Sequence, residues 1–142
     1  MKPVKLVTVF AENREGQVSR CSAVLAEAGI NIHWVNIAVS DGFGLIRFLV
    51  DKTRLAYEWL RQHGFTVSLV EILAVEVPNQ PGGLHGVVAA FADRGLSLNN
   101  CSGFVIDQRA ILLIEIEDLA AGREILARLK LHQLTEDELL AL

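Results

Sequence analysis

This sequence of 142 residues lacks several features that would fix its class at once. No apolar run approaches the roughly 18 residues of a membrane-spanning helix, so we expect no membrane partner. Its 13 lysine and arginine residues stand against 17 acidic ones and form no basic stripe, so we expect no nucleic-acid partner. With 11 glycines and 3 prolines, the chain is not collagen-like or of low complexity.

Cysteine and targeting signals are scarce as well. The two cysteines, Cys21 and Cys101, lie far apart and form no CxxC motif. The first residues lack the long apolar region and the small-residue cleavage site of a signal peptide. We therefore expect a cytoplasmic protein whose cysteines are small buried hydrophobic residues rather than disulfide partners.

Catalytic and metal-binding motifs are also missing. The four histidines form no HxxxH pair and have no carboxylate at ligand spacing. The sequence contains no GxSxG motif, Walker loop or GxGxxG motif, and no nucleophile has a partner base. We therefore expect no catalytic residue, no metal and no cofactor, and we expect that the protein is not an enzyme.

What the sequence has in excess is hydrophobic residues. They make up 51% of the chain, above the average of about 45–50% for soluble domains. This apolar content is ample for a buried core and excludes a disordered chain. The length allows one domain or two small ones.

An internal repeat organises the chain. A shift of 66 residues aligns its two halves without a gap. The aligned pairs include Asn13 with Asn79, Gly16 with Gly82, Gly29 with Gly95 and Leu60 with Leu126. After Gly16 and Gly82, apolar residues recur at i, i+3, i+4 and i+7, the face of an amphipathic helix. We therefore expect two copies of one unit, over residues 1–69 and 70–142.

Each copy is predicted to have the element order βαββαβ. Strands are expected near residues 4–10, 30–39, 46–50 and 65–69, and again near 72–77, 96–106, 112–116 and 131–134. This split βαβ pattern indicates an α+β fold, with a four-stranded antiparallel sheet and two helices on one face of it. Residues 66–77 contain no glycine, proline or asparagine, so the two copies should join without a flexible linker.

The last residues carry a helix-start signal. Thr135 and Glu138 have the spacing of a capping box, and Leu134 and Leu139 are placed as its hydrophobic staple. We expect one helical turn there.

Both faces of each predicted sheet carry apolar residues. Leu45 and Leu49 oppose the face of Ile46, Phe48 and Val50, and Ile111 and Leu113 oppose that of Leu112 and Ile114. Helices cover only one face of a two-layer unit, so we predict that a second copy covers the other face and that the protein is a homodimer. Residues 30–39 show no clean alternation, and a bulge there would invert their facing.

The loop before each first helix is a candidate ligand site. It combines an asparagine with a glycine, at Asn13 and Gly16 and again at Asn79 and Gly82. Glycine lets a ligand approach bare backbone, and the helix that starts there directs free N–H groups at it. The asparagine offers a donor and an acceptor, which suits a zwitterion. The alternative is that these are ordinary turn and cap residues.

At these two loops the sequence resembles the ACT domain, a small regulatory module that binds amino acids. The first match is Asn13-x-x-Gly16-x-Val18, followed by LAEAGINI over residues 25–32. The second is NQPGGL over residues 79–84, followed by ADRGLSL over residues 92–98. The resemblance implies two ferredoxin-like units that hold a free amino acid at their seam.

The same resemblance implies a set of ligand-binding residues. They are Asn13, Gly16, Gln17, Val18, Asn31 and Ile32 in the first copy, and Asn79, Gly82, Gly83, Leu84 and Leu98 in the second. The first copy departs from the family pattern with Glu15 in place of proline, and the second with Ser97 in place of an asparagine. Which of the two sites is functional is left open.

Three functions are compatible with these features. The first is a non-catalytic amino-acid sensor. The second is a regulatory subunit of an amino-acid biosynthetic enzyme such as acetolactate synthase. Residues 12–37 of this chain also resemble the small regulatory subunit of that enzyme. The third is an acylphosphatase-like hydrolase that would use Arg14 and Asn13, but the glycine-rich phosphate cradle of such an enzyme is absent.

Overall fold

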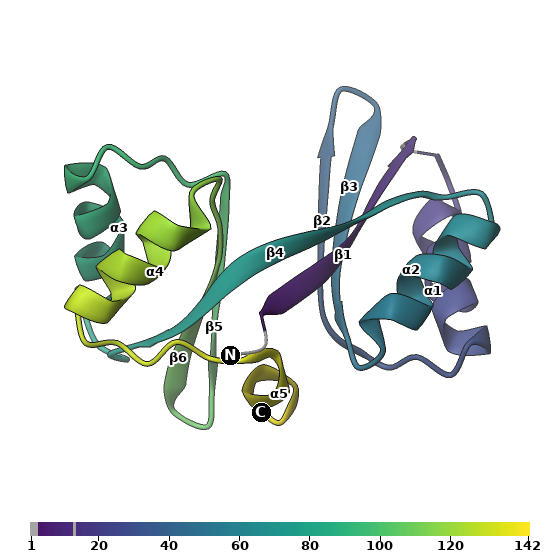
Figure 1. Ribbon diagram of the computed structural model, residues 1–142. Coiled ribbons are helices and arrows are strands. Elements are labelled where there is room, and N and C mark those ends of the chain that lie inside the picture. The colour runs from purple at the N-terminus through teal and green to yellow at the C-terminus, as the bar shows by residue number, and fades with distance from the viewer. Residues whose placement is uncertain (1–2, 13) are drawn as a thin grey trace. The chain divides into compact units, whose positions relative to one another are not determined.

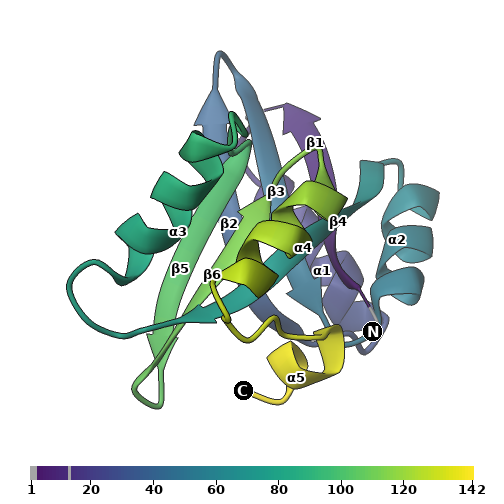
Figure 2. The same ribbon diagram turned by 60° about the vertical axis from the view of Figure 1, so that its left-hand side comes forward.

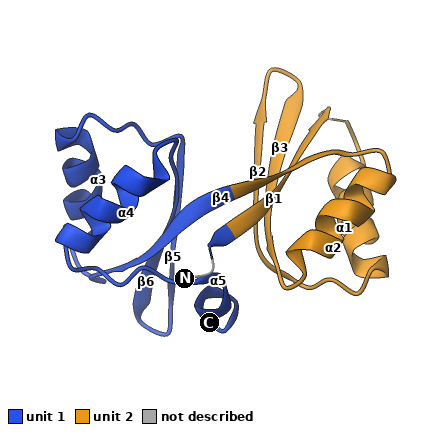
Figure 3. Cartoon of the chain, in the orientation of Figure 1, with its two compact units in different colours: residues 1–4, 71–142 blue, residues 5–70 orange. Residues whose placement is uncertain are grey.

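The computed structural model describes residues 3–12 and 14–142, which form two compact units (Figures 1 and 3). The N-terminal unit is Lys5–Val70, and the C-terminal unit is Glu71–Leu142 together with Pro3 and Val4. The division falls inside one long strand, β4 (Thr66–Val77). The strands predicted near 65–69 and 72–77 are therefore a single strand, as the absence of a linker indicated.

The N-terminal unit packs an antiparallel sheet against two helices. Its remaining elements are β1 (Val4–Glu12), α1 (Gln17–Glu27), β2 (Ile32–Ser40), β3 (Phe43–Val50) and α2 (Thr53–Gln62). β3 is central and pairs with both neighbours, since Phe48 lies opposite Val7 of β1 and Val35 of β2. Helices α1 and α2 cover one face of this sheet (Figure 1).

The C-terminal unit repeats this arrangement. Its elements after β4 are α3 (Gly83–Asp93), β5 (Asn100–Ile106), β6 (Arg109–Glu115), α4 (Leu119–Arg128) and α5 (Glu136–Leu140). β6 pairs antiparallel with β4 and β5, and α3 and α4 lie on one face (Figure 2). The strand predicted at 131–134 is reduced to a bridge between Gln133 and Val75. The α+β fold of two ferredoxin-like repeats is confirmed.

Equivalent residues form the two cores. Cys21 and Leu25 of α1 are fully buried, and so are Val87 and Phe91, which lie 66 residues later in α3. The helical periodicity predicted these positions correctly. It was wrong for the first turn of each helix, where Val18 and Leu84 are exposed. Cys101, expected to be buried, is exposed on the edge strand β5, and both cysteines are free.

A bulge sets the facing of β2. The register with β3 shifts between Ile32 and Trp34, so that Trp34 lies opposite Leu49 and Val35 opposite Phe48. The missing alternation in this segment indicated such an irregularity. Beyond the bulge, Val35, Ile37 and Val39 alternate along the strand and are 46%, 47% and 54% exposed.

The second face of each sheet does not need a second copy to bury it. Leu49, Ile111 and Leu113 are outside the two helix-covered cores, as expected, yet they are only 2%, 0% and 2% exposed in the single chain. Leu45 on the same face is half-buried, so the exposure of this face does not by itself require a second copy.

The predicted cap at the end of the chain is present. The Thr135 side chain accepts a hydrogen bond from the Glu138 backbone, and the Glu138 side chain accepts one from the Thr135 backbone. Leu134 and Leu139 are both buried, as a hydrophobic staple requires. Among the described residues, no helix is both long and apolar enough to span a bilayer.

Two helical glycines should respond in opposite ways to alanine. A β-carbon at Gly122 in α4 would lie 2.6 Å from Cδ1 of the buried Leu73, whereas one at Gly86 in α3 would have no neighbour within 4 Å. We expect Gly86→Ala to raise the free energy of unfolding by about 1 kcal/mol, because alanine favours the helix. Gly122→Ala should lower it by about 1 kcal/mol, because overpacking outweighs that gain. Urea unfolding measures both, and changes of the same sign would contradict the packing argument.

Candidate functional site

The same backbone hydrogen bond precedes the first helix of each unit. The Arg14 N–H donates to the Glu12 carbonyl, and 66 residues later the Gln80 N–H donates to the Pro78 carbonyl, both at 2.9 Å. Each turn ends at a glycine in the left-handed region, with φ of 83° at Gly16 and 90° at Gly82. The sequence repeat is therefore also a repeat of local structure.

The two helices begin without a side-chain cap. Gly16 and Gly82 occupy the N-cap positions of α1 and α3, and a glycine has no side chain that could accept a hydrogen bond from the first turn. An uncapped helix start leaves backbone N–H groups for solvent or for an anion. Both loops can therefore offer donors to a carboxylate.

A cavity of about 250 Å³ lies beside the loop of the C-terminal unit. Its apolar walls are Pro78, Pro81, Val87, Leu129 and Leu131. Gly82, Gly83 and Gly86 contribute bare backbone, and Gln80 contributes an amide. None of the described residues that line it has a charged side chain. Apolar walls with a few polar groups are typical of small-molecule sites.

Gly83 is required for this loop to close. A β-carbon at Gly83 would lie 2.1 Å from the Pro78 carbonyl oxygen, so no other residue fits the observed backbone. The Gly83 N–H also donates to the Gln80 carbonyl at 3.0 Å. The two glycines of this loop are therefore needed for different reasons. Gly82 adopts a left-handed backbone, and Gly83 leaves no room for a β-carbon.

The predicted site residues of the N-terminal unit begin α1 and β2. Asn13 lies outside the described residues. Gln17 and Val18 form the first turn of α1, where Gln17 Oε1 accepts a hydrogen bond from Arg20 Nη1 at 2.9 Å. Asn31 precedes β2, and its backbone N–H donates to Asp51 Oδ1 at 3.0 Å. Ile32 is half-buried and packs against the core of this unit.

The predicted residues of the C-terminal unit divide into two groups. Gly82 and Gly83 line the cavity, whereas Asn79, Leu84 and Leu98 do not. Asn79 donates from Nδ2 to the Gln108 carbonyl at 3.1 Å and so fastens the loop to the β5–β6 hairpin. Leu84 is exposed, and Leu98 packs against the core.

Sequence reasoning missed the opposite wall of the cavity. Leu129 and Leu131 follow α4, far along the chain from the loop. Nothing local marks them as site residues. Gly86 did carry a signal, since an isolated glycine inside a helix is costly and often has a packing or functional reason.

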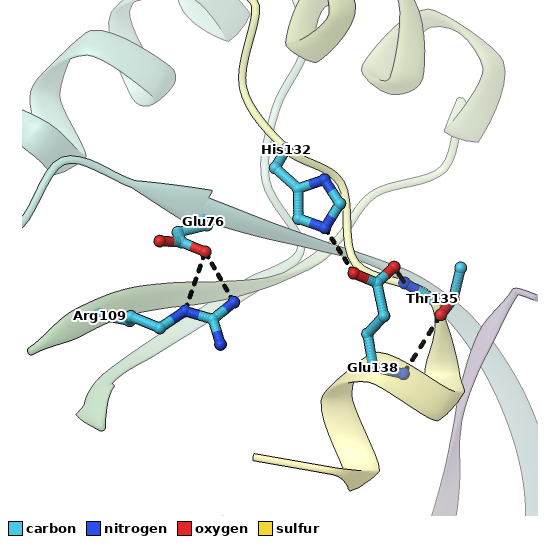
Figure 4. A network of polar contacts seen from close by, with 5 residues as sticks. All are labelled: Glu76, Arg109, His132, Thr135 and Glu138. Atoms are coloured by element: carbon cyan, nitrogen blue, oxygen red, sulfur yellow. Dashed lines mark hydrogen bonds and ion pairs between the residues drawn. The ribbon is translucent and has the colours of Figure 1, made fainter. Parts of the chain in front are cut away.

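Charged residues of the C-terminal unit form a network of polar contacts (Figure 4). Arg109 donates from Nε and Nη2 to Glu76 Oε1 at 3.1 and 2.7 Å, which lowers the pKa of Glu76. Nε2 of His132 lies 2.6 Å from Glu138 Oε2, and this contact lowers the pKa of Glu138, as does the hydrogen bond from the Thr135 backbone. The described residues hold no group of acidic, histidine or cysteine side chains suited to a metal.

Cysteine chemistry is also disfavoured in the first core. Burial raises the pKa of the Cys21 thiol to about 11, against a smaller opposing effect of Arg20. The thiol is therefore protonated near neutral pH, and Cys21 acts as a small core residue.

The duplicated fold and its paired loops define a tandem of ferredoxin-like modules, and comparison identifies the family. The model of the ACT domain pair matches residues 2–142, so the chain belongs to that family, a regulatory module. Protein BT0572 from Bacteroides thetaiotaomicron has the same fold, with a TM-score of 0.90 and 26% identity over 99% of this chain and 97% of that one. A search of curated proteins finds no match.

Two regulatory subunits share the fold at lower similarity. The regulatory subunit of aspartate kinase from Thermus flavus has a TM-score of 0.63 and 16% identity, over 90% of this chain and 93% of that one. The corresponding subunit from Thermus thermophilus has a TM-score of 0.61 and 16% identity, over the same shares.

The cap at the end of the chain should depend on pH. Because the pKa of Glu138 in the folded protein is below its ordinary value of 4.5, the carboxylate stabilises the fold at neutral pH. This contribution is lost as the pH falls through the lowered pKa. We expect Glu138→Gln to be less stable than the parent at pH 7, with a difference that shrinks below about pH 4.

Urea unfolding at several pH values measures this effect. Glu27→Gln, which changes an exposed acid on α1, is the control and should have little effect at any pH. A Glu138→Gln difference that is constant over the pH range would show that the charge does not contribute.

Proposed function

We propose that this ACT domain pair is a non-catalytic sensor that binds a free amino acid at the loop preceding α1, the loop preceding α3, or both. The observation that carries the proposal is the uncapped helix start after a left-handed glycine, present in both units. The free N–H groups of such a helix start favour a carboxylate. Every amino acid carries that carboxylate, whatever its side chain.

The asparagine of each loop supplies the second half of the recognition. Asn79 is held in place by its hydrogen bond to the Gln108 carbonyl. Because the Nδ2 atom makes that bond, the Oδ1 atom is the group we assign to the ligand's ammonium. Asn13 is proposed to have the same role in the N-terminal unit. The other residues predicted from the family resemblance keep their proposed roles, apart from Ile32 and Leu98, which pack against the two cores.

Ligand binding should stabilise the fold. A free amino acid at a hundredfold excess over its Kd should raise the free energy of unfolding by about 2.7 kcal/mol, because it binds only the folded state. A thermal-shift panel of the amino acids measures this. The double variant Asn13→Ala, Asn79→Ala should lose the shift.

The ligand-free melting temperature separates the two effects of this variant. Loss of the Asn79 contact to the hairpin lowers the melting temperature with or without ligand, whereas loss of binding removes only the ligand-induced part. If no amino acid at millimolar concentration shifts the parent protein, the proposed function is wrong.

We also propose a homodimer, on a different surface from the one that the sequence suggested. β2 is an edge strand, and Val35, Ile37 and Val39 on it are about half exposed. An exposed apolar edge is a template for another strand, and a two-fold axis brings the same strand of a second copy against it. The exposed free thiol of Cys101 is consistent with a reducing cytoplasm, where we propose the protein acts.

A charge on β2 should separate the dimer. Ile37→Lys should shift the protein from dimer to monomer at micromolar concentration in light scattering, because lysine on an edge strand blocks strand pairing. The control is Val105→Lys, which places the same charge on the other edge strand, β5, and should leave the dimer intact.

A monomeric parent would contradict the dimer. A parent that instead binds a catalytic chain in fixed stoichiometry would favour the alternative function, a regulatory subunit of an enzyme such as acetolactate synthase.

A further inference from the structure

The two units differ at the cavity of about 250 Å³ beside α3. Every residue that lines this cavity has an equivalent 66 positions earlier in the N-terminal unit. Gly83 corresponds to Gln17 and Gly86 to Arg20, so two long polar side chains in one unit are absent from the other. Because both loops make the same turn hydrogen bond ahead of a left-handed glycine, the two units can be compared residue by residue.

In the N-terminal unit, Arg20 occupies the corresponding place. Its guanidinium carbon lies 4.7 Å from the centre of the Phe65 ring, over its face, and Nη2 donates to the His63 carbonyl at 3.5 Å. Nη1 donates to Gln17 Oε1 at 2.9 Å. His63 and Phe65 are the equivalents of the cavity walls Leu129 and Leu131. The N-terminal unit therefore fills this place with its own side chains.

In the C-terminal unit the same place is open. Gly83 has no room for a side chain, because its β-carbon would clash with the Pro78 carbonyl. At Gly86, by contrast, nothing lies within 4 Å of a β-carbon, so the glycine is not required by packing. A glycine inside a helix lowers helix stability relative to alanine, and here it keeps the cavity empty.

We propose that the C-terminal unit is the one that holds the ligand, and that the ligand is an amino acid with a small uncharged aliphatic side chain. This inference rests on the proposed function and specifies which loop acts and for which substrate class. The aliphatic group enters the cavity between Val87 and the pair Leu129 and Leu131, in the place that Arg20 fills in the other unit.

The chemistry of the walls selects this class. The cavity is lined by apolar side chains and one amide, without a charged partner. A charged side chain placed there would lose its hydration and gain no counter-ion, which is unfavourable. The volume is below the roughly 300–1,000 Å³ of sites for drug-sized ligands, which favours a small occupant.

The test compares leucine, lysine and aspartate by calorimetry on the full chain. Leucine should bind the parent at least about tenfold more tightly than lysine or aspartate. Gly86→Leu places an aliphatic side chain in the cavity and should weaken leucine binding by at least about tenfold. Gly86→Ala adds only a β-carbon and should weaken leucine binding less than Gly86→Leu does, so that the loss follows the volume placed in the cavity. Arg20→Leu makes the matched change in the N-terminal unit and should not weaken binding.

Each other outcome overturns a distinct statement. If the parent binds amino acids but Gly86→Leu binds leucine as the parent does, the assignment to this cavity is wrong and the proposed function stands. If lysine or aspartate binds most tightly, the substrate class is wrong. If Arg20→Leu rather than Gly86→Leu weakens binding, the N-terminal unit holds the ligand. If none of the twenty amino acids binds, the proposed function and this inference both fail.

Discussion

The burial of alternate strand residues beneath two helices is the constraint on which the rest of each unit depends. Phe48 on β3 and Ile114 on β6 are fully buried, and each lies on a strand that pairs with neighbours on both sides. Because side chains alternate between the faces of a strand, fixing these residues in the core fixes the facing of every paired residue. The positions of the edge strands and of the loops that lead into the helices follow from that register.

The sequence predicted these features because they are local or periodic. Helical spacing located the buried faces of α1 and α3 at Cys21, Leu25, Val87 and Phe91, and the repeat gave independent support for each. Capping is local as well, so the spacing of Thr135 and Glu138 was sufficient to predict α5. Most of the fold could be predicted in this way, and so could the glycines that shape both loops.

Features that depend on contacts between residues far apart in the sequence could not be predicted. Whether Leu49 and Ile111 needed a second chain depended on what covers them, which no strand pattern states. The exposure of Cys101 depends on β5 being an edge strand, and the cavity depends on Leu129 and Leu131 returning to a loop far earlier in the chain. A periodic pattern gives the face of a residue but not what covers that face.

A tandem repeat relieves this limit in part, because each copy serves as a structural control for the other. A residue needed for the shared backbone should be glycine in both copies, as at Gly16 and Gly82, which adopt the same left-handed conformation. A glycine found in one copy alone, such as Gly86 opposite Arg20, is not required by the fold that the copies share. Its cost in helix stability then needs another reason, and an open cavity beside the glycine supplies one. Asymmetry within a symmetric fold therefore indicates where the function of the two copies has diverged.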